Sequence, residues 1–241
     1  MFEEGASSSC LQGFYEQGSC VESTTLKDFQ LIAITDAASC PRSLLEQVER
    51  IGACTHKPSK LILRAKELNA VEYAALAQQF LPLCQTYHIE LMLHSHWQIA
   101  LELGITQVHM PLPLLAQMPE ELRRSLFIST SVHSITEAQQ ALALGANVLI
   151  AGHIYATSCK ADLPPRGLEF LRSICAFAQQ KCAKTKAQAE VPTTHQGAIQ
   201  FIPQAVPVYA IGGIDFDTKQ WRELRENGAS GACIMSAYMK I

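Results

Sequence analysis

Short apolar runs alternate with segments of helical periodicity from residue 31 almost to the end of the chain. Runs of this length are typical of buried β-strands, and apolar positions that recur about every 3.6 residues are typical of amphipathic helices. The expected strands are LIAIT (31–35), LILRA (61–65), ELMLH (90–94), QVHM (107–110), LFISTS (126–131), NVLIAG (147–152), VPVYAIGG (206–213) and GACIMS (231–236). The expected helices cover 41–52, 70–87, 97–104, 135–145, 167–180 and 216–228.

The alternation predicts an α/β fold of the (β/α)8 class, a TIM barrel with parallel strands inside and helices outside. About eight strand–helix units are present, whereas an open doubly wound sheet usually has five or six strands and a glycine-rich fingerprint after the first. The first strand here is followed by TDAAS, which is no such fingerprint. Gly104, Gly145 and Gly228 each end a helical segment, as expected for a residue just beyond a helix C-terminus.

One domain of this fold accounts for nearly the whole chain of 241 residues. Residues 1–28 show no periodicity and are expected to form a flexible N-terminal tail, which leaves 29–241 for the barrel. The stretch at about 181–205 is polar, mixed and longer than ordinary connections, so we expect a surface insertion there.

The composition limits the partners of the protein. A formal net charge of −3 offers no broad basic surface for nucleic acid, although local positive groups can still bind small phosphorylated molecules. No apolar stretch approaches the roughly 18 residues of a membrane span. The nine cysteines form no CxxC pair, which indicates reduced thiols and a cytoplasmic protein. The sequence leaves a homo-oligomer open.

Two neighbouring strand ends carry the features of a phosphate site. Gly212 and Gly213 close the seventh strand and allow the backbone to approach a ligand closely. The backbone amides near Met235 and Ser236 follow the eighth strand at the start of a helix. Because the loops after strands seven and eight commonly hold phosphate in this fold, we expect a phosphate there rather than a plain tight turn.

Positive side chains follow two other strands. Arg64 and Lys66 are two residues apart at the end of the second strand, so both side chains face the same way on extended backbone. Lys160 lies in the loop after the sixth strand. These three cations are candidates for binding an anionic substrate, and an exposed loop lysine is an equally good interpretation of Lys160.

Histidines are concentrated at the strand ends, at His94, His96, His109, His133 and His153. A ring of imidazoles raises the question of a metal, but acidic side chains are scarce at these ends and we predict none. Proton transfer is the more natural role, because an imidazole with a pKa near 6.5 both accepts and returns protons at neutral pH.

The chain from Leu31 to Met239 resembles the thiamine-phosphate synthase superfamily of (β/α)8 barrels. The resemblance lies in LIAITD, LILRAKEL, SVHSITEAQQALALGANVLIAGHIYATSCK, VPVYAIGGI and GACIMSAY, in the superfamily's order. SVHS, the GH after the sixth strand and the Cys-Lys of the next loop are most similar to its thiazole tautomerase branch.

Two departures separate the chain from the synthase that it resembles. The synthase has an Asn-Asp pair where this chain has His94 and Ser95, and an acidic residue where this chain has HMPLPLL. In the synthase those side chains hold magnesium against a pyrophosphate, which requires oxygen ligands. On this ground we expect synthase activity to be disfavoured.

The resemblance implies a thiazole tautomerase, an isomerase of thiamine biosynthesis that aromatises a phosphorylated thiazole carboxylate. His133 matches the proposed acid/base of that branch and would move the proton, and such a group contributes about 10²–10⁴-fold. Arg64, Lys66, His94 and Lys160 would contact the substrate, whose phosphate would lie near Gly212, Gly213, Met235 and Ser236. The predicted reaction needs no cofactor.

Three alternatives remain open at this point. The chain could be a thiamine-phosphate synthase that joins thiazole phosphate to pyrimidine pyrophosphate. It could be a non-catalytic barrel that binds a phosphorylated metabolite, or a metal-dependent lyase or hydrolase that uses the histidines.

Overall fold

Eight parallel strands close into a barrel in the computed structural model, which describes residues 26–157, 162–189 and 206–241. The strands follow one another around the barrel in chain order, and β1 pairs with β8 to close it. They are β1 (Gln30–Ile34), β2 (Lys60–Leu63), β3 (Glu90–His94), β4 (Gln107–His109), β5 (Phe127–Val132), β6 (Val148–Gly152), β7 (Val208–Ile211) and β8 (Gly231–Ile234). The predicted (β/α)8 barrel is confirmed.

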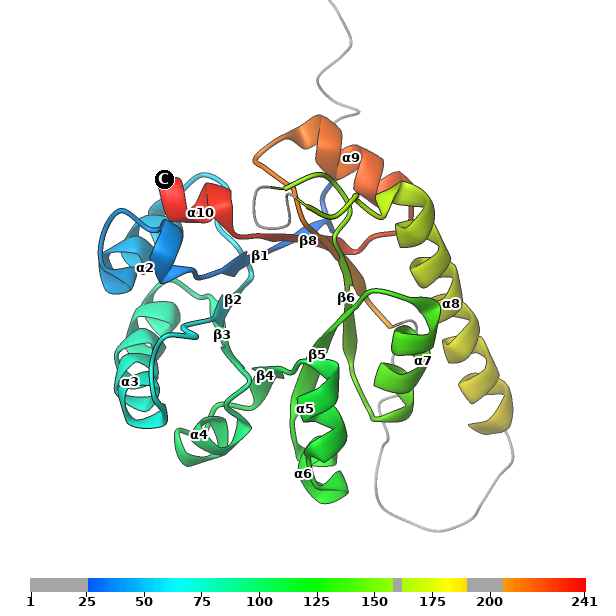
Figure 1. Ribbon diagram of the computed structural model, residues 1–241, viewed down its shortest axis with the longest axis horizontal. Coiled ribbons are helices and arrows are strands. Elements are labelled where there is room, and N and C mark those ends of the chain that lie inside the picture. The colour runs from blue at the N-terminus through cyan, green and yellow to red at the C-terminus, as the bar shows by residue number, and fades with distance from the viewer. Residues whose placement is uncertain (1–25, 158–161, 190–205) are drawn as a thin grey trace, which may run out of the picture.

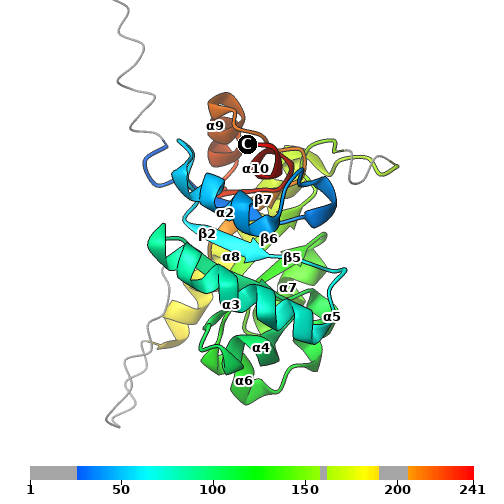
Figure 2. The same cartoon turned by 90° about the vertical axis from the view of Figure 1, so that its left-hand side faces the viewer.

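Helices surround the strands on the outside, and Figure 1 looks into the ring that they form. They are η1 (Ala37–Ser39), α2 (Leu44–Ala53), α3 (Ala70–Thr86), α4 (Trp97–Glu102), α5 (Leu112–Gln117), α6 (Glu120–Ser125), α7 (Ile135–Ala143), α8 (Gly167–Ala189), α9 (Thr218–Glu226) and α10 (Ser236–Lys240). Figure 2 shows α2 and α3 side by side on the outer face of the barrel. None of the helices that the structure describes combines the length and apolar character needed to cross a membrane.

Each strand buries both of its faces, because alternate residues point into the barrel and outward against the helices. In β1, Leu31 and Ala33 belong to the layer between strands and helices, while Ile32 and Ile34 belong to the barrel interior. The interior cluster contains Ile32, Ile34, Ile62, Met92, Val148, Ile150, Tyr209 and Cys233. Apolar side chains therefore fill the barrel below its carboxyl end.

Hydrogen bonds join the C-terminal end of the chain to Arg42 and to residues of α2. The backbone oxygen of Ile241 accepts from Arg42 Nη1 at 2.6 Å and from Arg50 Nε at 3.1 Å. Gln47, fully buried in α2, donates from Nε2 to the oxygen of Tyr238 at 2.5 Å. These bonds fix α10, and with it the loop after β8, against the first helix of the barrel, as the C label beside α2 in Figure 1 shows.

Most expected elements are present. The predicted glycines after helices are confirmed, since Gly104, Gly145 and Gly228 have φ of +68°, +90° and +93°. The proline-rich segment after β4, for which no helix was expected, forms α5 and α6. Of the expected insertion, 181–189 continue α8 as helix and the rest lies outside the described residues, as does the expected tail up to residue 25.

Candidate functional site

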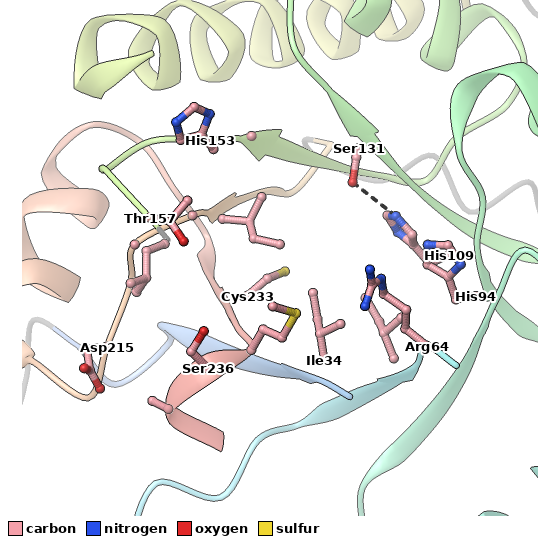
Figure 3. Close-up of a pocket in the computed structure, with 18 of the residues that line it drawn as sticks. Ile34, Arg64, His94, His109, Ser131, His153, Thr157, Asp215, Cys233 and Ser236 are labelled. Atoms are coloured by element: carbon pink, nitrogen blue, oxygen red, sulfur yellow. Dashed lines mark hydrogen bonds between the residues drawn. The ribbon is translucent and has the colours of Figure 1, made fainter. Parts of the chain in front are cut away.

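A cavity of about 600 Å³ opens at the carboxyl ends of the strands, a volume within the usual range for small-molecule sites. Figure 3 shows Arg64, His94 and His109 on one side of it, and Asp215 and Ser236 across from them. The lining residues come from every strand of the barrel. They are Ile34, Ile62, Arg64, Lys66, His94, His109, Ser131, His133, Gly152, His153, Thr157, Ile211, Gly212, Gly213, Ile214, Asp215, Cys233, Met235, Ser236 and Ala237.

Arg64 and Lys66 both line the cavity from the end of β2. Buried Thr35 fixes the backbone of Arg64, because its hydroxyl accepts from the Arg64 N–H at 2.8 Å and donates to the Arg64 oxygen at 3.0 Å. The Arg64 guanidinium donates from Nη1 to Asp36 Oδ1 at 2.5 Å. A carboxylate thus orients the guanidinium, and only part of its donor fork is used in this pair.

The end of β3 places His94 beside these cations. Ser95 Oγ lies 2.8 Å from His94 Nδ1, and Tyr73 Oη accepts the His94 backbone N–H at 3.0 Å. Burial, together with the positive charges of Arg64 and Lys66, lowers the pKa of His94 to about 4. At neutral pH His94 is therefore a neutral imidazole whose second nitrogen is not bonded to Ser95.

His109 at the end of β4 is buried and fully engaged. Its Nδ1 lies 2.9 Å from Ser129 Oγ and its Nε2 lies 3.1 Å from Ser131 Oγ, both in β5. Burial, and then the neighbouring His94 at 5.3 Å between ring centroids, lower the pKa of His109 to about 3. The imidazole is neutral and orients the Ser131 hydroxyl, which faces the cavity.

His133 lines the cavity from just beyond β5. Its Nδ1 donates to the Gly152 oxygen at 2.8 Å, since a carbonyl oxygen can only accept, and this leaves Nε2 as an acceptor in the neutral ring. Glu137 Oε2 accepts the His133 backbone N–H at 2.6 Å, and the Glu137 N–H donates to Ser134 Oγ at 3.0 Å. The start of α7 therefore fixes the position of the imidazole.

The loops after β6 and β7 pack backbone against backbone on the other side of the cavity. The N–H groups of Ile154 and Tyr155 donate to the oxygens of Ile211 and Gly212 at 2.9 and 3.0 Å. A Cβ on Gly213 would lie 2.3 Å from the Ala156 oxygen, so only glycine fits. Both Gly212 and Gly213 have positive φ, at +104° and +66°, a conformation that glycine adopts without strain.

The structure brings most of the residues singled out from the sequence to this one cavity. Arg64, Lys66, His94, His133, Gly212, Gly213, Met235 and Ser236 all line it. Lys160 lies outside the described residues. His109 and His153 line it as well, whereas His96 packs on the ring of Tyr73 at 4.0 Å and lines an adjoining pocket.

Sequence reasoning missed the apolar floor and several polar side chains of the cavity. Ile34, Ile62 and Cys233 form part of the floor, and burial raises the pKa of the Cys233 thiol, which keeps it protonated. Thr157 and Asp215 line the opposite side. The alternation of inward and outward residues along each strand, traced from Arg64 back to Ile62, was the signal that could have identified the floor.

Comparison with known proteins relates nearly the whole chain to one family. The family model described as thiamine monophosphate synthase matches residues 31–238. The thiamine-phosphate synthase of Syntrophomonas wolfei is 29% identical over 219 residues, which cover 88% of this chain and 89% of that protein. The thiamine-phosphate synthase of Clostridium acetobutylicum is 32% identical over 151 residues, 61% of this chain and 70% of that protein.

A solved structure agrees with these relatives. The thiamine phosphate pyrophosphorylase of Pyrococcus furiosus superposes with a TM-score of 0.64 at 25% identity, and the match covers 89% of each chain. The similarity therefore extends across the barrel and includes the strand ends that line the cavity.

The prediction of a thiazole tautomerase, an isomerase, is wrong on these comparisons, because these relatives and the solved structure carry the name of the synthase or pyrophosphorylase. The prediction gave decisive weight to two missing acidic positions. It gave less weight to the cations, although Arg64 and Lys66 place two positive charges at the same cavity.

Proposed function

Because the chain belongs to the thiamine monophosphate synthase family, we propose that it joins thiazole phosphate to pyrimidine pyrophosphate and releases pyrophosphate. This makes it a transferase of thiamine biosynthesis. The names of the relatives and of the solved structure support the reaction, and the two-sided cavity supports the substrates. Its free cysteines suit the reducing environment of the cytoplasm, where we propose that it acts.

One observation carries the proposal, namely that cationic side chains and a glycine-lined loop face each other across one cavity. The reaction needs two anionic groups to be held at once, the pyrophosphate of one substrate and the phosphate of the other. We assign pyrophosphate to the side of Arg64 and Lys66. We assign the thiazole phosphate to Gly212, Gly213 and Ser236, which line the cavity across from the cations.

The chemistry then follows from position and charge. A bond forms between the thiazole ring nitrogen and the pyrimidine methylene carbon, and the bond from that carbon to pyrophosphate oxygen breaks. Negative charge develops on the leaving pyrophosphate, where Arg64 and Lys66 stabilise it. The apolar floor at Ile34 and Ile62 holds the two rings together and excludes water from the reacting carbon.

His133 receives a different role from the one expected of it. Its free ring nitrogen accepts hydrogen bonds, so it is suited to a donor N–H or O–H on the bound rings. We assign it to orienting substrate between the two anion sites. Lys160 remains a candidate third cation for the same anions.

The magnesium that the synthase resemblance implies does not fit the described residues near the cations. No group of three or more His, Cys, Asp or Glu side chains within that part of the chain is arranged to hold a metal ion. Asp36 is paired with Arg64, and His94 offers nitrogen where a hard cation prefers oxygen. We therefore derive no step through a metal.

The test is direct measurement of thiamine phosphate formed from the two substrates, separated by chromatography and identified by mass. We expect steady turnover by the purified chain and a loss of roughly 10–100-fold in kcat/KM for Arg64→Ala, because a charge-assisted contact is removed. Lys57→Ala removes an exposed cation near the opposite end of β2 and should change little. A folded protein that makes no thiamine phosphate would contradict the proposal.

A further inference from the structure

The side chains that line the cavity from the ends of β2 and β3 are the two cations Arg64 and Lys66 and the neutral ring of His94. Arg64 and Lys66 supply positive charge, and both are close enough to His94 to disfavour its protonation. Ser131 presents a hydroxyl from the neighbouring side, held by His109. The surroundings therefore resemble those of a directly bound oxyanion.

Two carboxylates of the described residues near the cavity are paired with a cation or lie across from the cations. Asp36 contacts the Arg64 guanidinium at 2.5 Å and so offsets one positive charge. Asp215, the carboxylate that lines the cavity, lies across it from Arg64 in Figure 3. A divalent cation beside Arg64 and Lys66 would meet two positive groups and imidazole nitrogen, without the set of oxygen ligands that Mg²⁺ requires.

We propose that Arg64, Lys66 and His94 hold the pyrophosphate end of the substrate directly, without a bridging divalent cation. The inference rests on the proposed function, since it concerns the pyrophosphate subsite of that reaction. It distinguishes this chain from the magnesium-bridged arrangement that the resemblance to the synthase implies.

The geometry favours direct contact because Arg64 and His94 are held in place before the anion arrives. Thr35 fixes the Arg64 backbone from both sides and Asp36 holds its guanidinium. Ser95 bonds to Nδ1 of His94, and when its hydroxyl donates, the proton of the neutral ring lies on Nε2. That tautomer adds a third donor to the two cations.

The experiment is calorimetric titration of the full chain with inorganic pyrophosphate, once in EDTA and once with excess Mg²⁺. We expect binding in EDTA that is at least as tight as in Mg²⁺, because Mg²⁺ competes with the side chains for pyrophosphate oxygens. Binding that requires Mg²⁺ and disappears in EDTA would overturn the inference.

Two substitutions locate the subsite. Lys66→Ala should weaken pyrophosphate binding in EDTA by roughly 10–100-fold, whereas Lys57→Ala, its matched control, should leave it unchanged. His94→Asp places a carboxylate beside the anion and should weaken binding in EDTA by more than about tenfold, with Mg²⁺ restoring part of the loss. Unchanged binding in both Lys66→Ala and His94→Asp would show that pyrophosphate lies elsewhere.

Measuring pyrophosphate binding and turnover separately distinguishes the metal-free subsite from the proposed synthase reaction. Pyrophosphate titration measures binding at the subsite alone, whereas formation of thiamine phosphate measures the whole reaction. Metal-free binding without product would contradict the synthase proposal alone. Product formation together with Mg²⁺-dependent pyrophosphate binding would contradict the metal-free subsite alone.

Discussion

Two glycines with almost the same φ angle have very different surroundings. Gly104 has φ of +68° and open space where a Cβ would lie, whereas Gly213 has φ of +66° and the Ala156 oxygen 2.3 Å from that position. The first needs glycine only for its conformation. The second needs it also because the loop after β6 packs on it, and this packing shapes the proposed phosphate site.

Substitution by alanine at these two positions separates backbone strain at positive φ from steric overlap of the new Cβ with its neighbours. Gly104→Ala should lower the free energy of unfolding by about 1–2 kcal/mol, the cost of a left-handed residue that has a side chain. Gly213→Ala adds overlap with backbone and should cost a further ~1–3 kcal/mol. Urea unfolding measures both, and equal losses would show that the loop after β6 moves away freely.

Affinity for inorganic phosphate gives the second measurement on the same pair. Gly213→Ala should lose phosphate binding because the loop must shift, while Gly104→Ala should keep it. A Gly213→Ala variant that binds phosphate like the parent would remove this loop from the proposed site.

At the level of elements, one tyrosine of α3 joins the ends of β2 and β3. Tyr73 is fully buried, and its hydroxyl donates to the Leu63 oxygen of β2 at 2.6 Å and accepts the His94 N–H of β3 at 3.0 Å. Burial raises the pKa of this hydroxyl, which stays protonated and able to donate. The helix thereby sets the spacing of the strand ends that carry Arg64 and His94.

Removing that hydroxyl should destabilise the barrel and loosen the site. Tyr73→Phe leaves a buried carbonyl and a buried N–H without their partner, so we expect a loss of about 1–3 kcal/mol in urea unfolding. Tyr87→Phe is the control, since its hydroxyl makes no hydrogen bond to the described residues. Equal stability of the two variants would mean that water replaces the Tyr73 hydroxyl without cost.

The elements that the sequence did not reveal are short helices that begin at prolines. Pro111 and Pro119 are the N-cap residues of α5 and α6, where a missing N–H costs nothing. Helices of six residues span less than two turns and give no measurable period, so prolines suggested a loop. Longer elements such as α3 could be predicted because their apolar positions recur over several turns.

At the level of the whole molecule, the rule that barrel sites lie at the carboxyl ends of the strands predicted the position of the cavity. It did not predict the reaction. Arg64, His94 and His133 lie at or just after strand ends and reach one cavity, because parallel strands of a closed barrel all end at the same face. Ile62, two residues before Arg64, was not recognised as floor, although this spacing places both side chains on the same face of β2. The reaction depends on which groups meet a substrate, and strand-end position does not determine that.

Half-buried His94 and buried His109 also make the stability of the whole barrel depend on pH. The pKa of His94 is lowered to about 4 and that of His109 to about 3, against an ordinary value of 6.5. Below pH 6.5 these two histidines bind protons in the unfolded chain but stay neutral in the folded chain. The free energy of unfolding therefore falls as the pH falls. Each histidine contributes a slope of about 1.4 kcal/mol per pH unit until its folded pKa is reached.

Urea unfolding between pH 7 and about pH 4 at constant ionic strength measures this slope. His109→Gln introduces an amide that can bond to Ser129 and Ser131 but cannot take up a proton. The free energy of unfolding should therefore fall less steeply with pH, by the slope that one histidine contributes. Exposed His88→Asn is the control and should follow the parent curve. If His109→Gln followed it too, the imidazole of His109 would have to accept a proton inside the folded barrel, and the neutral hydrogen-bonded arrangement around Ser131 would be wrong.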